Sequence, residues 1–331
     1  MDDFRIPLGD WADSALAIIL VALRPFFDAV RDVFLGIYET VEALFVEPPA
    51  LVIIAIIVVL AFLVRGWKFA LGTALGLSLI VGVNQWEAAM ETLALVLVAS
   101  IIAIVISVPL GVLGARNQTA SNILKPTLDF LQTMPAFVYL VPALLLFRVG
   151  VVPGIVATII FALAPGVRFT ELGIRGVDRE VVEAGQAFGA SPWRILRQIQ
   201  LPLAMPTIMA GINQVIMLSL SMVVVAGLVG AGGLGSQIVR ALASIDVGLG
   251  VEAGVAVVII AIILDRLTAS IGAGVAGGRP NRRPFGWLFG SRLAPTLPSR
   301  SASAAAPGSA TAAPKTSTAI PTTKEKEEAH A

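Results

Sequence analysis

The chain has 331 residues, of which 57% are hydrophobic and 14% are charged, and its formal net charge is +1. Soluble domains carry roughly 25% charged and about 45–50% apolar residues. This composition nearly excludes a large water-soluble enzyme and favours a membrane protein with several spanning segments. The chain has no cysteine, and its single histidine is His330. Disulfides, zinc–thiolate sites and a Ser-His-Asp triad within the apolar body are therefore excluded.

Residues 1–49 mix apolar and acidic side chains and form the first region of the chain. The sequence opens on Met1-Asp2-Asp3, whereas a signal peptide needs a positively charged start, so none is predicted. Apolar residues recur at helical spacing over 25–46, and Pro48-Pro49 follows. The spacing predicts an amphipathic helix. It would either lie on the bilayer or serve only as a peripheral packing helix, and both readings stay open.

Seven apolar segments follow, and they predict an all-α polytopic protein with about seven transmembrane segments. The segments are residues 50–65, 69–84, 92–115, 126–149, 151–165, 203–228 and 251–273. As helices, the first two are about 24 Å long, shorter than a hydrocarbon core of about 30 Å. They form either a thin hairpin or two tilted helices. The span over 126–149 contains Pro135 and Pro142.

Positive charge predicts the orientation of these segments. With the polar stretch 167–202 placed in the cytoplasm, two cations, Arg148 and Arg240, fall on outer loops and ten on cytoplasmic ones. The ten are Arg65, Lys68, Arg116, Lys125, Arg168, Arg175, Arg179, Arg194, Arg197 and Arg266. This is the positive-inside pattern. It predicts an outer N-terminus and a cytoplasmic C-terminal tail over 274–331, whose Pro, Ala, Ser and Thr content is typical of disorder.

The stretch 167–202 interrupts the apolar body and predicts two short helices joined by a turn. Gly189 can end the first helix, over 181–188, in the left-handed conformation. Ser191 is a good N-cap, and Pro192 suits the first position of a second helix over 193–200. Pro202 is expected to break that helix before the next span. The result is a helix–turn–helix elbow on the cytoplasmic face.

The elbow has a recognisable spacing, which runs Glu-Ala-Gly, three residues, Gly, nine residues and Ile-x-Leu-Pro. It resembles the EAA motif of permease subunits of bacterial ABC importers of type I, with Gly185 where alanine is usual. The departure predicts a slight loosening of the first helix. In that family the elbow is the coupling helix, which sits in a groove of the ATPase subunit. The coupling residues that the resemblance implies are Glu183, Ala184, Gly185, Gly189, Arg194, Ile199, Leu201 and Pro202.

Further stretches resemble the glycine betaine/proline betaine permeases, a family of compatible-solute carriers that also handles choline, carnitine and ectoine. These stretches are residues 128–142, 210–217, 220–224, 227–235 and 251–254. The resemblance implies a five-helix core over 85–273, two accessory segments over 50–84 and a place in the bacterial inner membrane. It also implies a second permease copy, two ABC ATPase subunits and a periplasmic or lipid-anchored binding protein. No cofactor, metal or nucleic acid is expected.

Polar residues within two of the spans are candidates for the translocation path. A proline such as Pro135 frees a backbone carbonyl that must be satisfied by a neighbour or line a wet cavity. Asn213, Met217 and Ser221 share one helical face. The candidates are Gln132, Thr133, Pro135, Phe137, Asn213, Gln214, Met217 and Ser221. The alternative is hydrogen bonding between helices, which such residues often provide in membranes, and both readings stay open.

A glycine cluster after the sixth span satisfies the pattern G-x-G-x-x-G. A dinucleotide site requires a preceding strand, and here a membrane span precedes the cluster, so that reading is discarded. The cluster instead predicts a tight re-entry or a hinge at the outer gate, with docking surface for a binding protein. Its residues are Gly230, Gly232, Gly233 and Gly235.

The energy source must lie outside this chain. No lysine follows a glycine, so the P-loop signature is absent and an importer of this class needs a separate ATPase. The alternative function is an ion-coupled secondary carrier for small amines or osmolytes. Such a carrier would show inverted repeats and charged residues at the midplane. Neither is evident, and a carrier would leave the elbow unexplained.

Overall fold

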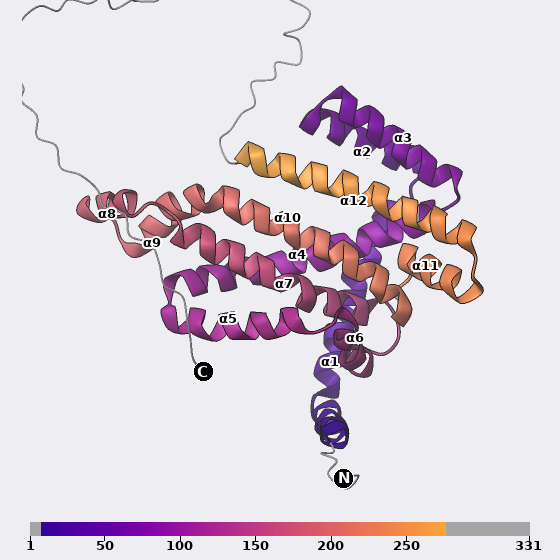
Figure 1. Ribbon diagram of the computed structural model, residues 1–331, viewed down its shortest axis with the longest axis horizontal. Coiled ribbons are helices and arrows are strands. Elements are labelled where there is room, and N and C mark those ends of the chain that lie inside the picture. Colours follow the sequence, from indigo (N-terminus) through magenta and orange to yellow (C-terminus); the bar gives the residue numbers. More distant parts are fainter. Residues whose placement is uncertain (1–7, 276–331) are drawn as a thin grey trace, which may run out of the picture. The chain divides into compact units, whose positions relative to one another are not determined.

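The computed structural model describes residues 8–275, and every regular element within that range is helical (Figure 1). The all-α class is therefore confirmed. The helices are α1 (Leu8–Val46), α2 (Ala50–Arg65), α3 (Trp67–Gly82), α4 (Trp86–Arg116), α5 (Gln118–Thr133), α6 (Ala136–Phe147), α7 (Val151–Arg175), α8 (Arg179–Ala187), α9 (Pro192–Ile195), α10 (Leu201–Ala226), α11 (Gly233–Ser244) and α12 (Val247–Val275). The predicted tail lies outside the described residues, apart from its first two positions, which end α12.

Helix α7 is the central helix of the bundle and packs against both α4 and α10. A Cβ on Gly166 of α7 would lie 2.7 Å from the Ser107 Cβ of α4 and 3.1 Å from the Val215 Cγ2 of α10. Helix α10 approaches through a glycine of its own, because a Cβ on Gly211 would lie 2.6 Å from the Phe169 Cβ. Small residues at such crossings let helix backbones come close, which is how helices associate in membranes.

Four helical stretches are long and apolar enough to cross a membrane: Trp86–Arg116, Val151–Arg175, Pro192–Val229 and Val247–Ser270. The first three contain the predicted segments 92–115, 151–165 and 203–228, and the fourth overlaps most of the predicted segment 251–273. Two further pairs qualify together but are bent, α1 with α2 by 95° and α5 with α6 by 98°. Helix α3 is a shorter apolar helix. The described residues thus contain four such spans, or six if each bent pair counts as one.

The N-terminal helices form the periphery of the bundle. The predicted helix over 25–46 is the C-terminal part of α1, which begins at Leu8. Tyr38 of α1 is buried in the main core, and Asp28 pairs with Arg148, which caps the end of α6, at 3.3 Å. These contacts favour the packing interpretation of this helix. Helix α2 has the bounds of the first predicted 16-residue segment, and α3 is the second one, beginning two residues earlier than predicted. They pack on one another as a hairpin around Gly66, whose φ is +88°.

The predicted segment over 126–149 is not one continuous helix, because the chain breaks into α5 and α6 at an angle of 98°. The break falls at Met134 and Pro135, whose ψ angles of 136° and 140° are extended. A residue before proline is pushed out of the helical region. The Tyr139 hydroxyl donates to the Leu131 carbonyl across the bend, which satisfies one of the carbonyls left open where α5 ends.

The prediction that Pro202 breaks the chain before the next span is also wrong. The chain stays helical from Pro192 to Val229, and a π-helical turn at Leu196–Gln200 joins α9 to α10. The Leu201 N–H donates to the Leu196 carbonyl, five residues back. The wider turn fits Pro202 in the first turn of α10, where a missing N–H and a bulky ring are tolerated. The part of the chain between the long helices is also shorter than the predicted stretch 167–202, because α7 continues to Arg175.

Helix α11 follows the glycine cluster and was not predicted. Gly230, Gly232 and Gly233 all have positive φ, at +78°, +81° and +64°, so they form a tight turn that leads into α11. The Gly233 N–H donates to the Glu91 Oε2 of α4 at 2.6 Å. The Leu234 N–H donates to the neighbouring Thr92 hydroxyl at 2.8 Å. Side chains of α4 therefore cap the N-terminus of α11.

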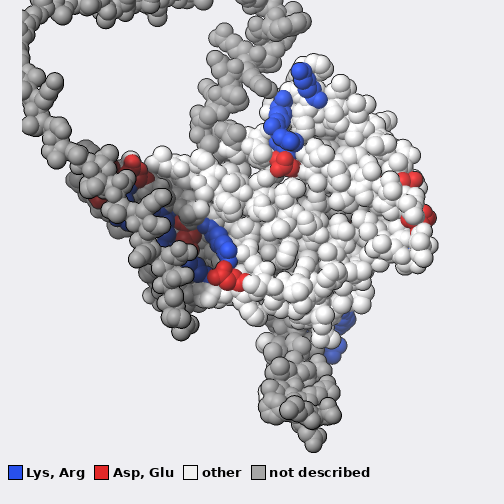
Figure 2. Space-filling model, in the orientation of Figure 1, with Lys and Arg blue, Asp and Glu red and all other residues white. Residues whose placement is uncertain are grey.

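Charged side chains are arranged as a membrane protein requires. Figure 2 shows that they gather along two edges of this face of the molecule, and that the broad surface between the edges carries none. Intramembrane charges are costly, so an uncharged band between charged edges suits a chain that crosses the bilayer.

Gly166→Ala is expected to destabilise the bundle, because the new methyl group would overlap the Ser107 side chain. Overpacking of this kind costs about 1–3 kcal/mol. Gly254→Ala in α12 is the matched control, since nothing lies within 4 Å of its added Cβ, and a helical Gly-to-Ala change stabilises by up to about 1 kcal/mol. Heating the detergent-purified protein and following its monodisperse fraction measures both variants. Equal midpoint temperatures would contradict the packing described here.

Candidate functional site

The elbow, residues 178–202, lies at one end of the bundle, where α8 and α9 project beyond the long helices (Figure 1). No residue of α8 is buried. Phe188 is 92% exposed, and Trp193 is 58% exposed. Large apolar side chains held this far from the core are typical of a contact surface for another protein.

A side-chain hydrogen bond caps the N-terminus of each of the two short helices. Asp178 caps α8 by accepting from the Glu180 N–H at 3.0 Å, and Ser191 caps α9 by accepting from the Arg194 N–H at 3.4 Å. Pro192 occupies the first turn of α9. The roles predicted for Ser191 and Pro192 are confirmed, whereas the Asp178 cap was missed although an Asp before a helix is a usual N-cap signal.

Gly189 ends α8 in the left-handed conformation, with φ +76°, as predicted. Its N–H donates to the Gln186 carbonyl at 2.8 Å, and the Ala190 N–H donates to the Gly185 carbonyl at 3.1 Å. The two bonds together are a Schellman motif, in which glycine avoids the steric penalty of a Cβ.

Gly185, where the motif usually has alanine, is the point at which α8 meets the π turn. A Cβ on Gly185 would lie 2.7 Å from the Ile199 Cδ1 and 3.6 Å from the Ile195 Cγ1. The glycine therefore lets Ile199 pack closely, and this contact joins the two halves of the elbow. Glu183 and Ala184, on the same helix, are exposed.

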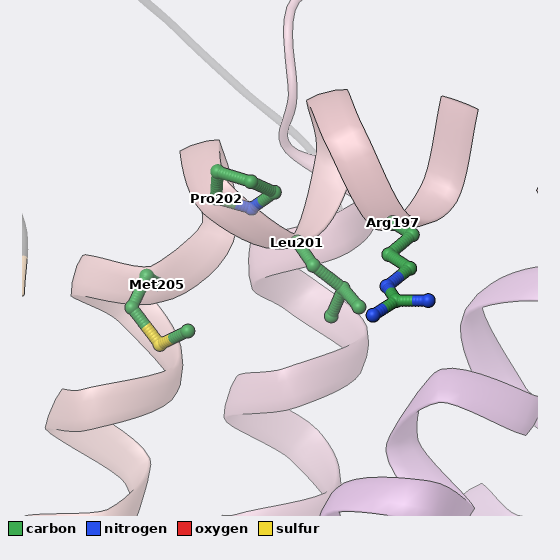
Figure 3. A pocket seen from close by; sticks show the side chains of 4 residues that line it. All are labelled: Arg197, Leu201, Pro202 and Met205. Carbon is green, nitrogen blue, oxygen red and sulfur yellow. The ribbon is translucent and has the colours of Figure 1, made fainter. Parts of the chain in front are cut away.

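The end of the elbow borders an open groove of about 270 Å³, lined by Arg197, Leu201, Pro202 and Met205 (Figure 3). Figure 3 shows the Arg197 and Leu201 side chains pointing the same way, with Met205 one turn further along α10. Leu201 and Pro202 of the predicted motif thus line a surface groove. The Arg116 guanidinium of α4 lies 5.9 Å from the centre of the Trp193 ring, a cation–π contact that ties the elbow to the bundle.

The predicted path residues fall on two separate helix surfaces. Most of them are exposed, namely Gln132, Thr133, Pro135, Phe137, Gln214 and Ser221, whereas Asn213 and Met217 are half-buried. Helix α7 packs against both α5 and α10. The Thr133 and Ser221 hydroxyls donate to carbonyls of their own helices, at 2.9 Å and 3.1 Å.

Asn213 forms hydrogen bonds between helices. Its Nδ2 donates to the Asp265 Oδ1 of α12 at 3.1 Å, and its Oδ1 accepts from the Thr268 hydroxyl. At this position the geometry favours the packing interpretation that the sequence left open. Gln214 points from a different side of α10 and is exposed, so its role in the path stays a prediction.

Comparison with known proteins agrees with the family that the elbow motif indicates. The sequence profile of the family described as "Binding-protein-dependent transport system inner membrane component" matches residues 107–276. The glycine betaine/proline betaine transport system permease protein ProW of Escherichia coli is 46% identical over 278 residues, which cover 84% of this chain and 78% of that protein. The chain belongs to this family. It is therefore a multi-pass inner-membrane permease component of an ABC importer, and not a catalytic subunit.

Two other relatives come from Listeria monocytogenes and Bacillus subtilis. The glycine betaine/carnitine transport permease protein GbuB of Listeria monocytogenes is 47% identical and covers 80% of this chain and 94% of its own length. The glycine betaine transport system permease protein OpuAB of Bacillus subtilis is 45% identical and covers 81% of this chain and 95% of its own length.

A solved structure shows the same fold. An inward-facing structure of the MetNI methionine ABC transporter superposes with a TM-score of 0.54 at 23% identity, covering 58% of this chain and 95% of that one. At this identity the match establishes the fold of the permease and nothing about its substrate.

Gly189→Ala is expected to loosen the elbow, because a left-handed conformation costs an L-residue roughly 1–2 kcal/mol. Hydrogen–deuterium exchange of the amides of residues 188–191 should then quicken by about tenfold. Gly185→Ala is the matched control, since the Ile199 Cδ1 that it meets is the end of a flexible side chain. Exchange in that variant should stay within about twofold of the unchanged protein. Equal exchange rates in the two variants would contradict the role given to Gly189.

Proposed function

We propose that this chain is the permease of an ATP-driven importer of glycine betaine, proline betaine or a related compatible solute. The chain receives the solute from an external binding protein. A separate ATPase subunit binds the elbow and supplies the energy for transport. The observation that carries the proposal is the exposed elbow, with its two capped helices and its Glu183 to Pro202 spacing. The printed names of the relatives at 45–47% identity support the class of solute.

The elbow suits a groove in an ATPase subunit because it is both rigid and exposed. The N-terminal caps of its two helices and the contact of Gly185 with Ile199 make the elbow one unit. Phe188, at 92% exposure, offers a large apolar anchor of the kind that dominates protein interfaces. Glu183 and Arg194, two further residues of the elbow, are also exposed.

One chain supplies half of a pathway, so the complex contains two permease copies and two ATPase subunits. The exposed path candidates of α5 and α10, namely Gln132, Thr133, Gln214 and Ser221, would line the passage between the copies. Phe130 and Phe137 flank the bend between α5 and α6 and are 64% and 55% exposed. Aromatic faces attract quaternary ammonium groups, which suits weak, transient contact with a betaine after a separate protein has recognised it.

The orientation that positive charge predicts places the elbow in the cytoplasm and the turn before α11 outside. In this arrangement the binding protein docks at the outer face, near the cluster formed by Gly230, Gly232, Gly233 and Gly235. The caps from Glu91 and Thr92 would hold that surface in shape. Both the N-terminus outside and the C-terminus inside follow from the same alternation.

Uptake of glycine betaine is expected to require ATP. The permease, its ATPase subunits and the loaded binding protein would be reconstituted in liposomes, and uptake of radiolabelled glycine betaine would be measured with ATP or a non-hydrolysable analogue on the ATPase side. Uptake should occur only with ATP, because the chain has no P-loop of its own and transport would depend on hydrolysis by the ATPase subunits. Uptake driven by a sodium or proton gradient without ATP would contradict the importer and favour a secondary carrier.

Single cysteines test the orientation and the docking surface together, since the chain has none of its own. Ala187→Cys places one on the elbow and Ser244→Cys places one at the end of α11, both at exposed positions. In spheroplasts a membrane-impermeant maleimide should label the α11 site and not the elbow site. In permeabilised membranes the ATPase subunit should slow labelling of the elbow site alone, by about tenfold. A reversed pattern would contradict the orientation, and unprotected labelling would contradict docking at the elbow.

A further inference from the structure

A buried carboxylate joins two helices just before the elbow. The Glu171 side chain of α7 is 8% exposed. Its Oε1 accepts a hydrogen bond from the Ser121 hydroxyl at 2.7 Å and lies 3.5 Å from the Lys125 Nζ. The Arg175 Nε, one turn further along α7, lies 3.1 Å from the same oxygen. Because Ser121 and Lys125 belong to α5, the carboxylate ties the end of α7 to the first turns of α5.

Arg175 extends this connection to α4. Its Nη2 donates to the Gly114 carbonyl at 2.8 Å, and its Nη1 donates to the Gln118 Oε1 at 3.1 Å. The Gly114 carbonyl lies in the last turn of α4, where carbonyls lack partners within the helix. A Cβ on Gly114 would lie 3.0 Å from the Glu171 Oε2, so glycine makes room for the carboxylate. The pair therefore holds the end of α4, the start of α5 and the last turn of α7 together.

The elbow leaves the bundle and returns to it beside this pair. Only residues 176–178 separate α7 from α8. A Cβ on Gly173 would lie 3.0 Å from the Thr207 Cβ and 3.2 Å from the Ala204 carbonyl oxygen, so the end of α7 packs directly on the start of α10. A displacement of the elbow therefore acts on α7 and α10 together, and the Glu171–Arg175 pair connects those helices to α5.

We propose that Glu171 and Arg175 are positioning residues that transmit displacement of the elbow to α5, an inference that rests on the function proposed above. Helix α5 is about 24 Å long, and its far end carries Gln132 and Thr133 at the bend into α6. A buried ion pair gives little net stability compared with apolar residues, and its best-attested role is to fix one arrangement of neighbouring elements. Five polar contacts gathered at one junction suit that role.

Glu171→Gln tests this in the full complex with its ATPase subunits and loaded binding protein. The amide keeps the shape and an acceptor for Ser121 but removes the charge that holds Arg175 and Lys125. The complex should assemble in normal yield and hydrolyse ATP, while the solute transported per ATP falls roughly three- to thirtyfold. Arg175→Lys keeps the charge but cannot reach the Gly114 carbonyl and Gln118 together, and the same ratio should fall.

Asp129→Asn is the matched control. Asp129 pairs with Arg168 and also joins α5 to α7, but these side chains are 65% and 41% exposed, so the ratio should stay within about twofold. A Glu171→Gln complex that transports as much solute per ATP as this control overturns the proposal, and so does a loss of assembly with an unchanged ratio. If Glu171→Gln does not assemble at all, an unchanged ratio in Arg175→Lys overturns it. Uptake without ATP by the unchanged complex would instead overturn the proposed importer.

Discussion

The close approach of α4 and α10 to α7 is the constraint on which the rest of this structure depends. Glycines at positions 111, 166, 173 and 211 remove the side chains that would keep these backbones apart. As a result, 67% of the apolar 18-residue stretch of α7 is buried, against 28% of the corresponding stretch of α12. Closely packed interiors have few alternative arrangements and transmit strain. A helix held this tightly on two sides moves with its neighbours, so a displacement at one end of α7 reaches the whole bundle.

Under the function proposed above, the elbow would receive force from the ATPase subunit and pass it to this closely packed bundle. Its first helix ends at Gly189 in a Schellman motif, and its second runs through a π turn into α10 with no break in the helix. The contact of Gly185 with Ile199 stops the two halves from moving independently. Because α7 enters the elbow and α10 leaves it, a partner that moves the elbow pulls on the two most closely packed helices of the chain. The π turn interrupts the regular α-helix between α9 and α10, and such turns often lie at functional sites.

Local signals predicted much of the site, and tertiary contacts decided the rest. The left-handed Gly189, the Ser191 cap and Pro192 depend on neighbouring backbone atoms only, and the sequence predicted all three. Prolines are different, because Pro109, Pro142 and Pro165 lie inside helices while Pro135 breaks one. At Pro135 the Tyr139 hydroxyl supplies the bond that the break requires, and sequence spacing does not reveal that contact. Helix α11 was missed for the same reason, since its N-terminus is capped from α4, 142 residues earlier in the chain.

Polar groups within the apolar body take their meaning from what they contact. The sequence leaves open whether Asn213 lines a path or joins helices, and its amide in fact bonds to Asp265 and Thr268 and joins α10 to α12. Glu171 lies in the stretch 167–202 that the sequence predicts to be polar, and it is buried between α7 and α5. In both cases the side chain connects a helix that continues into the elbow with a helix that does not. A membrane interior gives an unpaired polar group no water, so each such residue fixes the position of its partner. Under the mechanism proposed above, a few such contacts would carry motion from the elbow through a bundle built mainly of apolar residues.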